Sequence, residues 1–252
     1  MTTHGLVVRP PEDAVARADG HVHLTVSRGA SAPRNADWNR ARGLVVGLGI
    51  AAAALFALSF FRDWWSFVLY APQYPGGLRL QIALTGMGGD VHEIDLLNHY
   101  IGMHHLENAA PVERRLAGYG VAAIALLTVA LATASGRRFN KLLALPALAF
   151  PLLFLADSFY WLYSFGHHLD AHAPLKIGAF TPQMFGNGKI GQFETYAEPA
   201  LGFWLAVAGV ACVVAAAFVR SRVCAGCSHA ETCRVACPRL MVRSDSPKEQ
   251  HA

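Results

Sequence analysis

The sequence predicts an all-α membrane protein, a four-transmembrane-helix bundle with two long loops on one side and a cysteine-rich tail on the other. Hydrophobic residues make up 54% of the 252 residues and charged residues only 15%, which is too apolar for an ordinary soluble domain. Four apolar stretches are long enough to cross a bilayer, for which about 20 residues are needed. They cover residues 43–61, 116–135, 142–165 and 200–219.

The basic residues predict the orientation of these spans. Fifteen of the 21 Lys and Arg residues lie in tail 1–42, in the short loop between the second and third spans, or in tail 220–252. Basic residues collect on the cytoplasmic side, so we expect both termini there and loops 62–115 and 166–199 outside. Topology and contact with the lipid bilayer thus account for the net charge of +4, and no nucleic-acid partner is expected.

The segments between and around the spans are expected to differ in order. Tail 1–42 has no sustained period and is expected to be disordered. Trp64, Trp65, Tyr70 and Tyr74 follow the first span, as residues of an interfacial aromatic belt do. In loop 62–115, alternating residues 78–85 predict a short strand. A helix is expected near Val91, with Asp90 as its N-cap. The apolar residues of loop 166–199 indicate that it packs against the first loop.

The helix predicted after Asp90 carries most of the metal-ligand chemistry. In "DVHEIDLLNHYIGMHHLENAA", a helix through Glu107 would set one side chain every 100°. Such a helix gathers four ligand-type residues within an arc of about 80°: His92, Asp95, His99 and Met103. The opposite face carries Ile94, Leu97 and Ile101.

This mixture of ligands predicts a transition metal. Imidazole with thioether suits copper, particularly Cu(I), whereas imidazole with carboxylate suits zinc or iron. The candidate ligands are His92, His99, Met103, His104 and His105, with His167 and His168 after the third span as partners and Met184 as a further thioether. Asp95 would orient one of these histidines by accepting a hydrogen bond from the ring nitrogen that does not bind the metal. Asp157 lies within a span, where a carboxylate is costly unless it is paired or faces a cavity.

Two other interpretations of this segment stay open. Its polar side chains are also typical of a solvated face on a surface helix. A haem with histidine axial ligands is possible near the outer surface, although no histidine lies at the centre of a span.

Four cysteines in the last tail predict a second metal site. Cys224, Cys227, Cys233 and Cys237 follow the spacing C-x2-C-x5-C-x3-C-P. A cytoplasmic location disfavours structural disulfides, so metal ligation is expected. Both a [4Fe–4S] cluster and a tetrahedral zinc site fit four thiolates.

Two segments of the chain resemble a known group of proteins. "YPGGLRLQIALTGMGGDVHEIDLLNHYIGMHHLENAA" and "FTPQMFGNGKIGQFETYAEPALGFW" are similar to a family of polytopic membrane proteins associated with nitrous oxide reductase accessory gene clusters. The resemblance implies a multi-pass protein of the bacterial inner membrane, working beside periplasmic copper enzymes.

The expected function is therefore that of an accessory protein. It would bind or deliver copper on the periplasmic side, with a respiratory copper enzyme such as nitrous oxide reductase or a copper chaperone as partner. One alternative is a quinol-linked electron-transfer subunit with an iron–sulfur or haem centre, and another is a structural assembly scaffold. No nucleotide-binding or hydrolase motif is present, so a binding protein is favoured over an enzyme.

Overall fold

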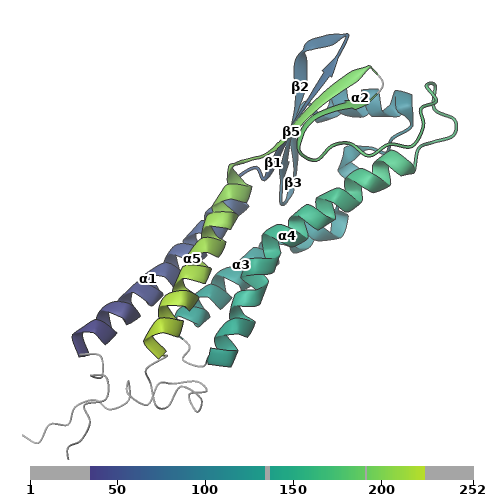
Figure 1. Cartoon of the computed structure of the whole chain (residues 1–252). Helices are drawn as coiled ribbons and strands as arrows, with labels where there is room; N and C mark the ends of the chain where they lie inside the picture. The colour runs from purple at the N-terminus through teal and green to yellow at the C-terminus, as the bar shows by residue number, and fades with distance from the viewer. Residues whose placement is uncertain (1–34, 134–136, 191, 225–252) are drawn as a thin grey trace, which may run out of the picture. The chain divides into compact units, whose positions relative to one another are not determined.

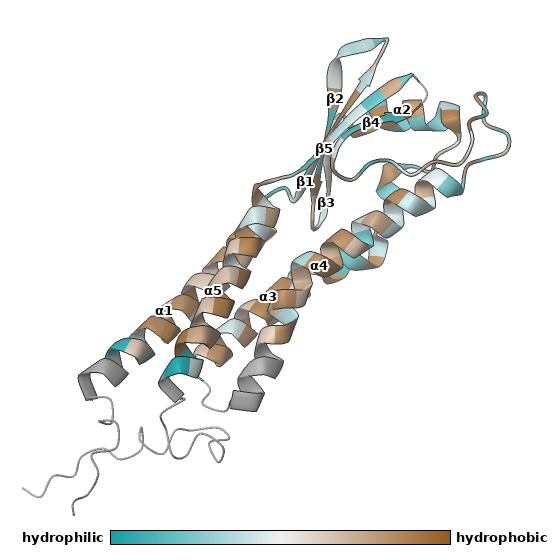
Figure 2. Ribbon diagram, in the orientation of Figure 1, coloured by the Kyte–Doolittle hydropathy of each residue, from teal (hydrophilic) through white to brown (hydrophobic). Residues whose placement is uncertain are grey.

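The computed structural model describes residues 35–133, 137–190 and 192–224. Four long helices dominate them: α1 (Asn35–Phe60), α3 (Pro111–Thr133), α4 (Arg137–His167) and α5 (Leu201–Cys224). Each contains a stretch long and apolar enough to cross a membrane, and Figure 2 shows the apolar residues running along all four. The four predicted spans fall on these four helices, which is consistent with a multi-pass membrane protein. Tail 1–34 and Cys227, Cys233 and Cys237 lie outside the described residues.

The helices pack unevenly. α1 packs along both α5 and α3, whereas α4 makes less extensive contacts with α3 and α5 (Figure 1). Small residues allow the close approach: a Cβ at Gly49 would lie 2.5 Å from the Cβ of Ala132, and one at Gly209 would lie 3.0 Å from the ring of Phe56. α4 contains two prolines, Pro146 and Pro151, and is the least buried of the four spans.

The all-α prediction is wrong, because the two long loops build a five-stranded antiparallel sheet and make the fold mixed α/β. The strands are β1 (Trp65–Ala71), β2 (Tyr74–Ala83), β3 (Gly86–Gly89), β4 (Gly186–Ile190) and β5 (Phe193–Pro199). Their order is β3-β2-β1-β5-β4. Of these five strands only β2 was predicted from the sequence, as a strand at residues 78–85. In β2, Leu78 and Leu80 are buried and Arg79 and Gln81 are exposed.

The central strand β1 joins the two loops. It pairs with β2 of its own loop and with β5 of the second loop, with Trp65 opposite Pro199 and Tyr70 opposite Glu194. The predicted packing of the second loop against the first is thus confirmed, and it occurs through strand pairing. We call the ends of the helices nearest this sheet the sheet end of the bundle (Figure 1).

A pair of tryptophans connects the sheet to the helices. Trp64 and Trp65 are 0% and 1% exposed, so the prediction that they belong to an interfacial belt is wrong. The ring of Trp64 packs at 4.7 Å from that of Phe154 in α4 and at 6.0 Å from that of Phe203 in α5. Its indole N–H donates to the Ser59 carbonyl at 2.9 Å. The pair is a core element between the sheet, α4 and α5.

The short helix α2 (Val91–Ile101) lies against the sheet. Ile94 and Leu97 are buried together with Leu78 and Leu80 of β2. The helix ends earlier than predicted, because Gly102 takes a left-handed conformation with φ of 77°, which glycine adopts without strain. Asp90 precedes the helix but does not cap it: its carboxylate accepts the backbone N–H of Arg79 at 2.8 Å.

Candidate functional site

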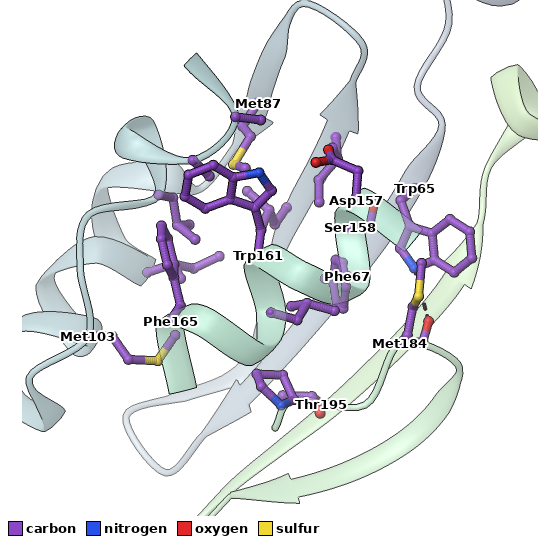
Figure 3. Close-up of a pocket in the computed structure, with 18 of the residues that line it drawn as sticks. Trp65, Phe67, Met87, Met103, Asp157, Ser158, Trp161, Phe165, Met184 and Thr195 are labelled. Carbon is purple, nitrogen blue, oxygen red and sulfur yellow. Dashed lines mark hydrogen bonds between the residues drawn. The ribbon is translucent and has the colours of Figure 1, made fainter. Parts of the chain in front are cut away.

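The main candidate site is a cavity of about 380 Å³ between the sheet, α2 and the sheet end of α4 (Figure 3). Its walls are mostly apolar and include Phe67 and Leu80 from the sheet, Leu97 from α2, and Phe154 and Phe165 from α4. Phe67 and Leu80 lie opposite each other on β1 and β2, and Leu97 belongs to the buried stripe of α2. Its volume is in the range of small-molecule sites, which are usually apolar with a few placed polar groups.

A few charged and polar groups interrupt this apolar wall. Asp157 and Ser158 reach it from α4, and Glu113 and Arg114 from the start of α3. The Arg114 guanidinium donates to the carbonyl of Leu106 at 3.1 Å and to that of Glu107 at 3.2 Å. Asp157 lines the cavity, which is one of the two ways a carboxylate within a span is accommodated.

Two polar atoms of the lining have unused hydrogen-bonding capacity. In the part of the chain that the structure describes, two buried side-chain polar atoms lack a hydrogen-bond partner, Trp161 Nε1 and Thr195 Oγ1. Both residues line the cavity. The Asp157 carboxylate interacts with the indole from one helical turn away, but Nε1 makes no hydrogen bond of good geometry. Buried polar groups are nearly always paired, so these two atoms mark where a ligand could bind.

Three thioethers also line the cavity. Met87 comes from β3, Met103 from the segment after α2, and Met184 from the segment before β4. Residues 35–133, 137–190 and 192–224 contain no other methionine. Figure 3 shows the three side chains at separate parts of the wall.

The predicted histidine face does not form one site. His92, His99, His104 and His105 are exposed, whereas Met103 turns into the cavity. Among the residues with described positions, no group of three or more His, Cys, Asp or Glu comes together in the geometry of a metal site. The early end of α2 at Gly102 is the physical reason, because it breaks the helical register that would align Met103 with His92 and His99.

Asp95 contacts both the backbone after α2 and one histidine. It is buried on the apolar side of α2, and its carboxylate accepts the backbone N–H of Leu106 at 2.9 Å. His105 Nδ1 lies 3.5 Å from the same carboxylate. Asp95 therefore holds the segment after α2 against the helix, and His105 is the one predicted ligand beside it.

The third-span histidines lie at the exposed end of α4. The His167 ring stacks on Tyr163 with centroids 3.9 Å apart, and His168 Nδ1 lies 2.9 Å from the Ser164 carbonyl oxygen. The chain after α4 does reach α2, because the backbone N–H of Asp170 donates to the Gly102 carbonyl at 2.8 Å. The two regions expected to meet are therefore adjacent, without their histidines forming a cluster.

A polar turn holds this junction. The Asp170 carboxylate accepts the backbone N–H of His172 at 2.8 Å and lies 3.2 Å from its ring Nδ1. The hydrogen bond from the His172 backbone, followed by that from its ring, holds the pKa of Asp170 below its ordinary value of 3.8. Because hydrogen bonds to a carboxylate favour its charged form, this turn is held by an ionised Asp170.

Sequence reasoning identified Asp157 and the apolar face of α2 but missed Trp161 and Thr195. A tryptophan at the sheet end of a span resembles an ordinary interfacial residue, and Thr195 belongs to a strand that the sequence pattern did not reveal. No model of a known protein family matches the chain, and no curated protein has a significantly similar sequence.

Proposed function

We propose that this chain is a multi-pass membrane protein that binds a small apolar molecule in the cavity at the sheet end of its bundle. The observation that carries this proposal is the composition of the cavity wall. Leu153 and Phe154 belong to the span Ala144–His167, Phe67 and Leu80 belong to the sheet, and all four line one cavity. An apolar ligand can therefore leave the lipid and contact the sheet without crossing water.

The distribution of basic residues supports an outward-facing cavity. Basic residues in the tails and at the start of α4, including Arg137, Arg138 and Lys141, favour a cytoplasmic location for the opposite end of the bundle. The cavity then lies on the outer side, which is the periplasmic side in a bacterial inner membrane. The protein would take its ligand from the outer leaflet.

Photolabelling in lipid nanodiscs tests the proposal. A diazirine-bearing alkyl probe is expected to label cavity residues of β1 and β2, which bulk lipid along the helices does not reach. Ser158→Leu adds a side chain from α4 to the lining and should reduce this labelling about tenfold, the effect of losing about 1.4 kcal/mol of binding. Ala156→Leu is the matched control, because Ala156 is exposed on the same helix and does not line the cavity.

Two labelling patterns would contradict the proposal. Probe found only on lipid-facing residues of α3 and α4, or sheet labelling that Ser158→Leu and Ala156→Leu change equally, would contradict it. Mapping the labelled residues by peptide mass spectrometry distinguishes these results.

A second candidate is the copper accessory role that the resemblance to proteins of nitrous oxide reductase gene clusters implies. The observation that favours it is that Met87, Met103 and Met184 line the same cavity. Thioethers bind Cu(I) without losing a proton. Their separate positions suit transient contacts along a passage better than one closed site.

Metal analysis separates the thioethers from the histidines as copper ligands. The purified protein is loaded with Cu(I) under anaerobic conditions. The copper role predicts loss of copper when the three methionines are replaced by leucine, and retention in a His92→Ala/His99→Ala double variant. Full copper retention in the methionine variant would reject thioether binding. A wild-type protein that takes up no copper would leave the scaffold role as the alternative.

A further inference from the structure

We infer that the ligand of this cavity is a neutral lipophilic molecule with hydrogen-bond acceptor oxygens, of the quinone headgroup class. The inference rests on the proposed function and names the chemistry of its ligand. It depends on the two unpaired polar atoms of the wall, on the charges beside them and on its aromatic side chains.

The unpaired atoms define the hydrogen-bonding chemistry. The indole N–H of Trp161 is a donor only, and the Thr195 hydroxyl can donate as well as accept. A ligand that pairs both must therefore offer at least one acceptor oxygen to Trp161. The two atoms come from α4 and β5, at different parts of the wall (Figure 3). A ligand with more than one acceptor oxygen, such as a quinone with its two carbonyl oxygens and ring substituents, offers acceptors at more than one position.

Glycine at position 188 allows the Thr195 hydroxyl to lie close against β4. Gly188 pairs with Thr195 across the strands, and a Cβ there would come within 2.6 Å of Thr195 Oγ1. Any larger residue would displace the hydroxyl from this position.

The charges of the wall indicate that the ligand is neutral. Asp157 and Glu113 are carboxylates and would repel a fatty-acid carboxylate or a phosphate. Arg114 supplies one positive charge against these two carboxylates, so the wall keeps an excess of acidic groups. An anionic lipid headgroup is therefore disfavoured.

The aromatic residues favour a flat ring. Trp65, Phe67, Phe154, Trp161 and Phe165 all line the cavity. Aromatic faces and edges pack well against another planar ring, whereas acyl chains gain no such geometry. A lipid ester has the same carbonyl chemistry without the ring, so it is the alternative source that the experiment must distinguish.

Competition with the diazirine alkyl probe in nanodiscs tests the inference. The competitors are a decyl-substituted benzoquinone, decylbenzene and a diacylglycerol. Decylbenzoquinone should abolish sheet labelling at a concentration about three- to tenfold lower than decylbenzene, as expected from one hydrogen bond. A diacylglycerol as effective as decylbenzoquinone would retain the acceptor chemistry and identify a lipid ester as its source.

Three variants assign the effect to the two atoms. Thr195→Val removes a hydroxyl with little change of shape, and Trp161→Phe removes the indole N–H together with one ring. Both should reduce the advantage of the quinone over decylbenzene. Trp204→Phe, on the exposed face of α5, should leave that advantage unchanged. Thr195→Val provides an independent test if Trp161→Phe folds poorly.

Failure of this inference differs from failure of the proposed function. Equal competition by decylbenzoquinone and decylbenzene, with sheet labelling intact, would overturn the acceptor chemistry alone. A wild-type protein with no sheet labelling would overturn the apolar binding site itself.

Discussion

The helices α1 and α4 both run through the bundle, but they are held in different ways. For α1, 28% of the span lies buried, through close contacts of small residues with α3 and α5. For α4 the buried share is 11%, and its closest partners at the sheet end are aromatic rings. One side of this fold is therefore closely packed, whereas the other side leaves space for a cavity.

This contrast depends on side-chain size. Close helix packing in membranes requires small residues at the contact, such as Gly49 and Gly209 here. Large rings such as Phe150 and Phe154 hold α4 farther from its neighbours and border the cavity.

The largest expected effect is on the α4 side. Trp64→Ala removes a fully buried ring that packs on Phe150 and Phe154 of α4. A loss of about 3–5 kcal/mol in the free energy of unfolding is expected from such a truncation. Denaturant titration in detergent measures the loss, and amide hydrogen exchange should increase more in α4 than in α1.

The control for that change is Trp204→Ala, because Trp204 is 56% exposed. It should cost less than about 0.5 kcal/mol. An equal increase of exchange in α1 and α4 after Trp64→Ala would show that the tryptophan supports the whole bundle, and the comparison would fail.

A smaller effect is expected on the α1 side. Gly49→Leu places atoms where a Cβ alone would lie 2.5 Å from Ala132 and 3.1 Å from the Thr128 carbonyl oxygen. Overpacking of this kind costs about 1–3 kcal/mol. Gly47→Leu is the matched control on the same helix, because a Cβ at Gly47 has no neighbour within 4 Å. Similar losses in both variants would contradict close packing at Gly49.

The smallest effect concerns the junction between α4 and α2. The pKa of Asp170 is lower in the folded protein than its ordinary value of 3.8. Its hydrogen bonds therefore stabilise the fold above about pH 4. This stabilisation disappears as the pH falls through the folded pKa. Asp170→Asn should lower the melting temperature slightly at neutral pH.

Acid titration of the melting temperature tests the sign of this effect. The gap between wild type and Asp170→Asn should close below pH 3.8, where the wild-type carboxyl also becomes neutral. His172→Ala removes the ring but keeps the backbone donor, so it should produce part of the same change. A gap that widens on acidification would contradict an ionised Asp170 in this turn.

The helices were predictable from the sequence and the sheet was not. Whether a helix can cross a membrane depends on about 20 consecutive residues, so hydropathy along the chain identified all four spans. The pairing of Trp65 with Pro199 depends on segments separated by α2 and by two long apolar helices, α3 and α4. No local pattern reports such a partner, and short strands such as β3 and β4 carry weak signals of their own.

The candidate site was predictable in part for the same reason. The apolar stripe of α2 and the presence of a carboxylate, Asp157, within a span are both visible in the local sequence. The residues of that stripe and Asp157 all line the cavity. The prediction that Met103 shares a helix face with the histidines was wrong, because the left-handed residue Gly102 ends α2 before it. Trp161 and Thr195 became identifiable only when α4 and β5 were brought to the same cavity.

The central position of β1 has a consequence for how the protein is made. Its partner β5 leaves the ribosome only after α3 and α4, so β1 waits with one edge unpaired while two further helices enter the membrane. An unpaired edge can pair with other chains, and such non-local pairing is slow to form. The sheet can therefore be completed only after α3 and α4 have been synthesised, and nascent chains stopped before β5 are expected to be targets for chaperones and proteases.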